Sequence, residues 1–145
     1  MYILYVRFKV FPLAARFLLC DRDGKVSVKK AEAMFPESAR QEIADFPGLK
    51  WKIWSIGDRG REGAGFYLFD TLEEAEARAR FAKKVYPRDG LYGVRCTVYE
   101  VLEDCSRATR APIDAPANPD AAPDVYQRLL REHKNPIIER YRRKK

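Results

Sequence analysis

Four stretches of the chain are rich in β-branched and aromatic residues, and apolar positions alternate with polar ones along much of their length. They span residues 2–10, 49–56, 63–70 and 91–102. Alternation with this composition predicts β-strands. Only a short turn that begins at Gly57-Asp58 separates the second stretch from the third. This spacing predicts a hairpin between these two strands.

A helical repeat of apolar positions lies between the third and fourth strands. Thr71 and Glu74 have the spacing of a capping box, which marks a helix start. The apolar positions that follow at helical spacing are Leu72, Ala75, Ala79 and Ala82. Pro87 and Gly90 predict the end of this helix.

A second helix is predicted over about 32–46, before the second strand, with Pro36 in its first turn. Its inner face would carry Ala39, Ile43 and Phe46. For residues 11–31 the pattern leaves two alternatives open, because PLAARFLLC fits either a short helix or a strand.

The predicted order is strand, helix, strand, strand, helix, strand. This order is typical of the α+β class with a ferredoxin-like, split βαβ arrangement, in which an antiparallel sheet carries both helices on one face. We therefore expect residues 1–113 to form one such domain.

Apolar side chains occupy both faces of two of these strands. In the second strand, one face carries Leu49, Trp51 and Ile53, and the other carries Trp54 and Ile56. In the third strand, one face carries Phe66 and Leu68, and the other carries Tyr67 and Phe69. Helices cover only one face, so we expect the sheet of a second subunit to cover the other and form a homodimer. The alternative is chance apolarity on an exposed face.

The C-terminal part of the chain differs in composition from the rest. Prolines concentrate in residues 114–123, which predicts an extended linker. Residues 124–145 carry eight basic and three acidic side chains, a net charge of +5 out of +7 for the chain. This tail can form an amphipathic helix through Val125, Leu129 and Leu130, interrupted at Asn135-Pro136. We expect it to dock on its own body or on a twin subunit, or else to be a solvated basic end. The alternative is binding of the tail to nucleic acid or to an anionic membrane.

Composition excludes several classes of protein. The chain contains no run of about 18 apolar residues, the length that a membrane-spanning helix needs. The first twenty residues, which include Arg7, Lys9 and Arg16, lack the pattern of a signal peptide. The three cysteines form no Cys-x-x-Cys pair, so a cytoplasmic protein without a membrane partner is the simplest interpretation. The single histidine, His133, lies beyond the linker and excludes a three-histidine zinc site within one chain.

Three segments carry a resemblance to a known family. They are FPGLKWKIW (46–54), EGAGFYLFD (62–70) and VLEDCSRATRAPI (101–113). In this order they resemble the YdhR-type monooxygenases, which belong to the dimeric α+β barrel proteins. The resemblance implies a homodimer that oxygenates, or isomerises, a small and often aromatic molecule without metal or organic cofactor. Bound haem is a further possibility that the resemblance raises, since some barrel relatives degrade it with a histidine ligand within the fold. Because His133 lies beyond the linker, we do not expect haem.

Such an oxygenase needs a dry pocket and a group that favours an anionic substrate. The pocket would be walled by Trp51, Trp54, Phe66 and Tyr99, with Arg7 at its side. We assign Arg95 and Tyr67 as candidate catalytic residues, with Arg95 placed to stabilise a phenolate or enolate. The alternatives are plain core or dimer interface for the aromatic residues, and an interface ion pair for Arg7 and Arg95.

Two other functions have weaker support. Residues 62–69 match an RNA-recognition motif at Gly63, Gly65, Phe66 and Phe69 but not at Glu62, Ala64 or Tyr67. Because Ala64 removes a stacking ring, we do not expect nucleic acid as a partner. An RNA-binding module or a non-catalytic small-molecule-binding module is the alternative function. Residues 21–32 resemble a calcium loop, but Lys25 and Val26 stand where a ligand and a glycine are needed, so a plain turn is expected.

Overall fold

The computed structural model describes residues 1–117 and 124–134. Its four strands are β1 (Tyr2–Lys9), β2 (Leu49–Gly57), β3 (Glu62–Phe69) and β4 (Tyr92–Glu100). Its α-helices are α1 (Pro12–Leu19), α2 (Val28–Ala33), α3 (Glu37–Ala44), α4 (Leu72–Val85), α5 (Glu103–Ala108) and α6 (Val125–Glu132). Short 3₁₀ turns, η1 (Asp58–Gly60) and η2 (Tyr86–Asp89), follow β2 and α4.

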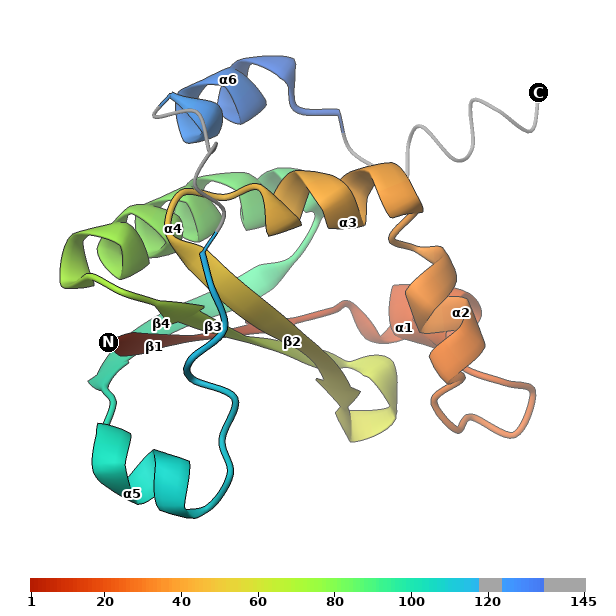
Figure 1. The fold of residues 1–145 in the computed structure, drawn as a ribbon. Coiled ribbons are helices and arrows are strands. Elements are labelled where there is room, and N and C mark those ends of the chain that lie inside the picture. Colours follow the sequence, from red (N-terminus) through yellow and green to blue (C-terminus); the bar gives the residue numbers. More distant parts are fainter. Residues whose placement is uncertain (118–123, 135–145) are drawn as a thin grey trace.

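The four strands form one antiparallel sheet in the order β2-β3-β1-β4. The helices α3 and α4 lie over one face of this sheet, α6 lies beyond them, and α5 lies on the opposite side (Figure 1). The arrangement confirms the predicted α+β, ferredoxin-like class, and β2 and β3 form the predicted hairpin.

The turn of the β2–β3 hairpin requires residues in the left-handed backbone conformation. Asp58, Arg59 and Gly60 all have positive φ, at 48°, 54° and 80°. Gly60 also packs against α1, where a Cβ atom would lie 3.1 Å from the Cβ of Leu19. A side chain at this position would therefore strain the backbone and push α1 away from the turn.

The predicted helix over 32–46 is wrong in one respect, because the structure divides this region at Pro36. The helix α2 ends at Ala33, and α3 begins at Glu37 with Pro36 as its N-cap. Proline removes a helical N–H donor and pushes the residue before it, Phe35, out of the helical region. In residues 11–31 the helical alternative holds, since α1 covers Pro12–Leu19.

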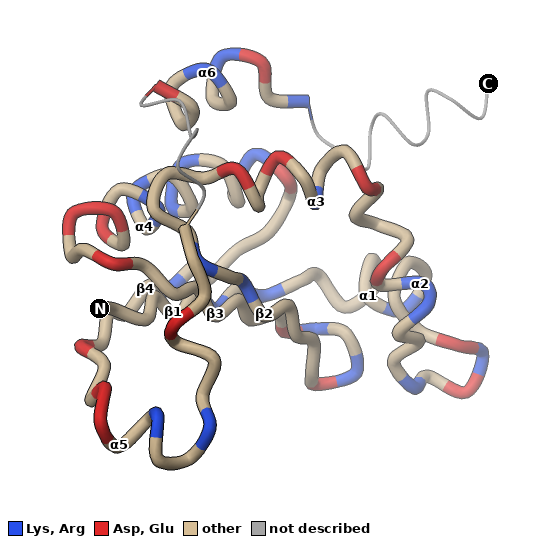
Figure 2. Tube along the Cα trace, viewed as in Figure 1, with Lys and Arg blue, Asp and Glu red and all other residues tan. Residues whose placement is uncertain are grey.

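The long helix α4 begins as the capping box predicts, with the Thr71 side chain accepting a hydrogen bond from the Glu74 N–H at 3.2 Å. Acidic side chains stand at its start and basic ones at its end (Figure 2), which suits the helix dipole. Its inner face buries Ala75, Ala79 and Ala82. These small side chains let α4 lie close to the sheet.

Strand β2 departs from regular alternation near its start. Leu49 pairs with Phe69 while Trp51 pairs with Leu68, so the strand contains a bulge. Leu49 therefore joins the helix-side core with Phe69, whereas Trp51 lies on the other face. The prediction that Leu49 shares a face with Trp51 and Ile53 is corrected by this bulge.

Candidate functional site

The sheet distributes the predicted site residues over two opposite faces. The face away from α3 and α4, here called the open face, carries Arg7, Trp51, Phe66, Arg95 and Tyr99. The helix side carries Trp54 and Tyr67. The two candidate catalytic residues, Arg95 and Tyr67, are therefore not brought together.

The open face is apolar and largely uncovered by the described residues. Tyr5 and Phe66 stack on it with ring centroids 4.9 Å apart, and Ile53 and Tyr99 are 53% and 54% exposed. A groove of about 660 Å³ runs from these strands to α5. At its α5 end, the Thr109 hydroxyl donates to the backbone carbonyls of Cys105 and Ser106. The groove combines apolar side chains with the polar groups of Tyr5, Tyr99, Glu100, Cys105 and Ser106.

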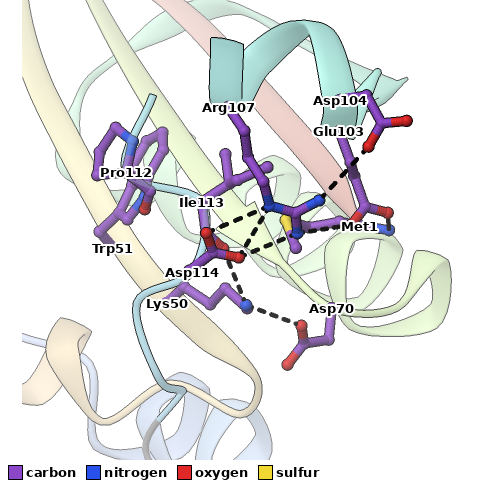
Figure 3. Close-up of polar contacts among 10 residues, drawn as sticks. All are labelled: Met1, Lys50, Trp51, Asp70, Glu103, Asp104, Arg107, Pro112, Ile113 and Asp114. Carbon is purple, nitrogen blue, oxygen red and sulfur yellow. Dashed lines mark hydrogen bonds and ion pairs between the residues drawn. The ribbon is translucent and has the colours of Figure 1, made fainter. Parts of the chain in front are cut away.

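A set of polar contacts closes one end of the open face and fixes Trp51 (Figure 3). The indole Nε1–H of Trp51 donates to the Pro112 carbonyl at 3.0 Å. Lys50 donates to the Ile113 carbonyl and forms an ion pair with Asp70 at 3.2 Å. Trp51 thus holds the segment after α5 against β2, which is a structural role.

The two arginines of the open face lie opposite each other in the pairing of β1 with β4. Arg7 forms an ion pair within the chain, with Glu62 of β3 at 3.6 Å. Arg95 is exposed on the edge strand. Neither guanidinium group lies in an enclosed space in the single chain.

The helix side holds a buried positive charge. Arg78 projects from α4 into the core and is only 1% exposed. Its guanidinium carbon lies 4.6 to 5.6 Å from the ring centroids of four aromatic residues, which are Phe46, Tyr67, Phe81 and Tyr86. Two of its nitrogens, Nε and Nη1, are buried and have no hydrogen-bond partner in the described part of the chain. A charged group in this state is costly, because burial removes the water that would solvate it.

The third nitrogen of Arg78 anchors a pair of tyrosines. Nη2 donates to the Tyr67 hydroxyl at 2.7 Å and to the Tyr86 hydroxyl at 3.0 Å. The two hydroxyl oxygens are 3.1 Å apart, so one O–H proton is used between them and the other remains to be donated. Burial raises the pKa of Tyr67, and the neighbouring charge of Arg78 opposes that rise. Tyr67 is consequently a neutral hydroxyl at physiological pH.

A second cation lies at the edge of the same region. The ammonium nitrogen of Lys52 lies 3.3 Å from the ring centroid of Trp54 and 4.9 Å from that of Tyr67. Burial, and secondarily the charge of Arg78, lowers the pKa of Lys52 well below its ordinary value. No carboxylate among the described residues forms an ion pair with Lys52 or Arg78. We call Lys52, Tyr67, Arg78 and Tyr86 the cation cluster.

The sequence patterns did not predict three members of the cation cluster, which are Lys52, Arg78 and Tyr86. Arg78 was passed over because charged residues in helices usually face solvent, although it falls within the predicted apolar face of Ala75, Ala79 and Ala82. That position is the signal by which it could have been found. Lys52 stands between Trp51 and Ile53, and its direction follows only from the register with Tyr67. Nothing in the sequence singles out Tyr86.

Residues 1–117 and 124–134 contain neither a cluster of metal ligands nor a membrane-spanning helix. Within these residues, no group of three or more histidine, cysteine, aspartate or glutamate side chains is arranged to hold a metal ion. None of the helices described has both the length and the apolar character needed to cross a bilayer.

The fold and its two faces define the class of the protein as a ferredoxin-like α+β domain with helices on one face of the sheet. The family model described as "Putative mono-oxygenase ydhR" matches residues 21–112, and the chain therefore belongs to this family. The match confirms the resemblance found in the sequence. A search of curated proteins gives no significant match. The matched region contains the cation cluster and ends before α6.

Proposed function

We propose that the protein is a cofactor-independent monooxygenase whose substrate, a small electron-rich aromatic molecule, binds at the cation cluster. The observation that carries this proposal is the buried Arg78 guanidinium beside the Tyr67 and Tyr86 hydroxyls, with two nitrogens that find no partner in the part of the chain that the structure describes. Perturbed ionisable groups held among aromatic side chains are characteristic of reaction sites. The membership in a family described as mono-oxygenases supports the reaction class.

The reaction we propose is oxidation of an acidic CH₂ group next to an aromatic ring. Loss of a proton gives an enolate or phenolate, which reacts directly with O₂. One oxygen atom becomes the oxygen of the new C=O group, and the other leaves as water with the two hydrogens of the CH₂ group. The substrate supplies all four electrons, so the balance requires no separate reductant.

Each member of the cation cluster has a role in this scheme. The Nε–H and Nη1–H groups of Arg78 would stabilise the substrate oxyanion, because fixed donors act strongly where water is excluded. The remaining tyrosine O–H would donate a further hydrogen bond. Lys52 would accept the substrate proton, since a lowered pKa gives it a larger neutral fraction near pH 7.

Lys52 and Trp54 form the edge of the cluster on β2. Trp54 is 38% exposed at this edge and contacts Phe35, with ring centroids 4.7 Å apart. The side chain of Lys52 lies over Gly65, where a Cβ atom would be 3.3 Å from Lys52 Cε. The Lys52 ammonium nitrogen thus lies beside Trp54 and Tyr67, where it would accept the substrate proton.

The proposed assembly and location extend the scheme. We propose that two copies pair through the open face, because exposed aromatic and aliphatic side chains gather there and a second sheet would remove them from water. We place the protein in the cytoplasm, an assignment supported by its three free cysteines, Cys20, Cys96 and Cys105.

The test is oxygen uptake by the purified protein with a panel of aromatic compounds that carry an acidic CH₂ group. We expect at least one compound to be oxidised and Arg78→Met to abolish its turnover. Arg80→Met, which changes an exposed arginine of the same helix, is the matched control and should retain it. Binding of the panel without oxygen uptake would favour a non-catalytic binding module, and turnover that survives Arg78→Met would refute the assigned site.

A further inference from the structure

The C-terminal helix α6 packs over the cation cluster although it lies outside the region matched by the family model. Val125 is 3% exposed. The ring of Tyr126 packs against Phe46 and Phe81, with centroid distances of 5.1 and 5.0 Å. These two rings also flank the Arg78 guanidinium. Tyr126 is therefore part of the wall that encloses Arg78.

The buried polar atoms that lack a hydrogen-bond partner in the described residues belong to this wall. They are Arg78 Nε, Arg78 Nη1, Glu74 Oε2 and the Tyr126 hydroxyl oxygen. The charges of Arg78 and Glu74 both act on Tyr126, whose pKa is raised mainly by burial. Tyr126 is thus a neutral O–H group beside a cation and a carboxylate. Native proteins satisfy nearly all buried polar groups, so unsatisfied atoms on three neighbouring side chains of the core are unusual and suit a polar ligand.

Besides the packing of Val125 and Tyr126, two polar contacts attach the C-terminal end of α6. Arg88 donates to the Leu130 carbonyl at 2.9 Å, and His133 Nε2 lies 2.7 Å from Asp89 Oδ1. Both contacts are made to η2. A helix of eight residues is only marginally stable in isolation, so its stability depends on packing against the rest of the fold. Such elements open at a lower free energy than the strands of the core.

We propose that α6 is a movable wall of the site and that Tyr126 binds the substrate directly. This inference rests on the function proposed above, since it concerns the same site. Arg78 and Tyr126 both donate, so they recognise one anionic oxygen, whereas Glu74 accepts and recognises a hydroxyl group. The substrate class that satisfies all three is an aromatic molecule with an oxyanion and a second, protonated hydroxyl. The helix moves away to admit it and closes over it.

The probe for the test is the monoanion of 4-nitrocatechol, which carries one oxyanion and one neutral hydroxyl. It is titrated into the full-length ¹⁵N-labelled protein while the Arg78 Nε–H signal and the backbone signals of α6 are followed. We expect both to shift. Tyr126→Phe, which removes only the hydroxyl, should weaken binding by about tenfold, the range for one hydrogen bond. Tyr92→Phe, on β4 away from the cluster, should bind like the wild type.

A second variant tests the movement of the wall. His133→Ala removes the contact to Asp89 and should speed both amide exchange in α6 and association of the probe. A shifted Arg78 signal, together with unchanged affinity in Tyr126→Phe and unshifted α6, would overturn this inference and leave the site intact. An unshifted Arg78 signal in the presence of bound probe would overturn the site itself, and the role of Tyr126 with it.

Discussion

Replacement of Arg78 by methionine tests whether Arg78 serves ligand binding or the stability of the fold. Methionine is unbranched and flexible, so it fills most of the space of the arginine stem without charge. Arg78 contributes two hydrogen bonds in the free protein, at 2.7 and 3.0 Å. Hydrogen bonds to charged groups contribute about 1.5–3 kcal/mol each. Their loss therefore costs about 3–6 kcal/mol.

The free-energy cost of keeping the charged Arg78 buried has a similar size to the gain from its hydrogen bonds. Two buried nitrogens of Arg78 lack partners among residues 1–117 and 124–134, and each unsatisfied position costs about 1–3 kcal/mol. Burial of a charge without a counter-ion adds several kcal/mol. Methionine removes both penalties, and the hydrogen bond between Tyr67 and Tyr86 can remain. We expect the free energy of unfolding of Arg78→Met to lie within about 1 kcal/mol of the wild type, or above it.

Urea titration of the free protein, followed by far-ultraviolet circular dichroism, measures this difference. Arg80→Met on the exposed side of α4 is the control, and it should change the free energy of unfolding by no more than about 0.5 kcal/mol. A loss of about 3 kcal/mol or more in Arg78→Met, with Arg80→Met unchanged, would refute the reasoning. Arg78 would then be a structural element of the core, and its unpartnered nitrogens would not indicate a ligand.

Three further predictions follow from other parts of the structure. The pKa of Lys52 in the folded protein lies well below its ordinary value of 10.5. Between the folded and the ordinary pKa the unfolded chain binds more protons than the folded one, so the free energy of unfolding rises with pH. Urea titrations across this pH window should show the rise in the wild type but not in Lys52→Met, and equal slopes would contradict the burial argument. Phe66→Glu should convert a dimer to monomers in sedimentation analysis, while Leu13→Glu on exposed α1 should not; a dimer that persists would exclude the open face as its interface. Thr71→Ala should lower the free energy of unfolding by about 1 kcal/mol, because α4 loses its cap; an unchanged urea midpoint would show that the cap is dispensable.

The sequence predicted the fold well because the fold depends on local patterns. Alternating strands, the capping box at Thr71 and the order of the elements each specify part of the sheet and of α4. The division of the helix before β2 was missed, although Pro36 was visible, because proline is tolerated in a first turn and only the backbone shows where that turn lies. The bulge near Leu49 was missed because register depends on partner strands.

The candidate site was predicted only in part, and the reason is geometric. Strand alternation shows that Trp54 points away from Trp51 and Tyr67 away from Phe66, but the sequence alone does not say which face the helices cover. Arg78 and Tyr86 come from α4 and η2, and only packing brings them to Tyr67. Tyr126 joins them from beyond the linker. Sites assembled from distant segments are therefore the part of the protein that periodicity reveals least.

The most direct test of the account is a crystal structure of the protein with bound 4-nitrocatechol, because the sheet offers two faces and the ligand must choose between them. We predict density for the probe on the helix side, with its oxyanion within hydrogen-bond distance of Arg78 Nε or Nη1. Density confined to the open-face groove beside Phe66 and Tyr99, with the surroundings of Arg78 unchanged, would contradict the assignment of the cation cluster as the functional site.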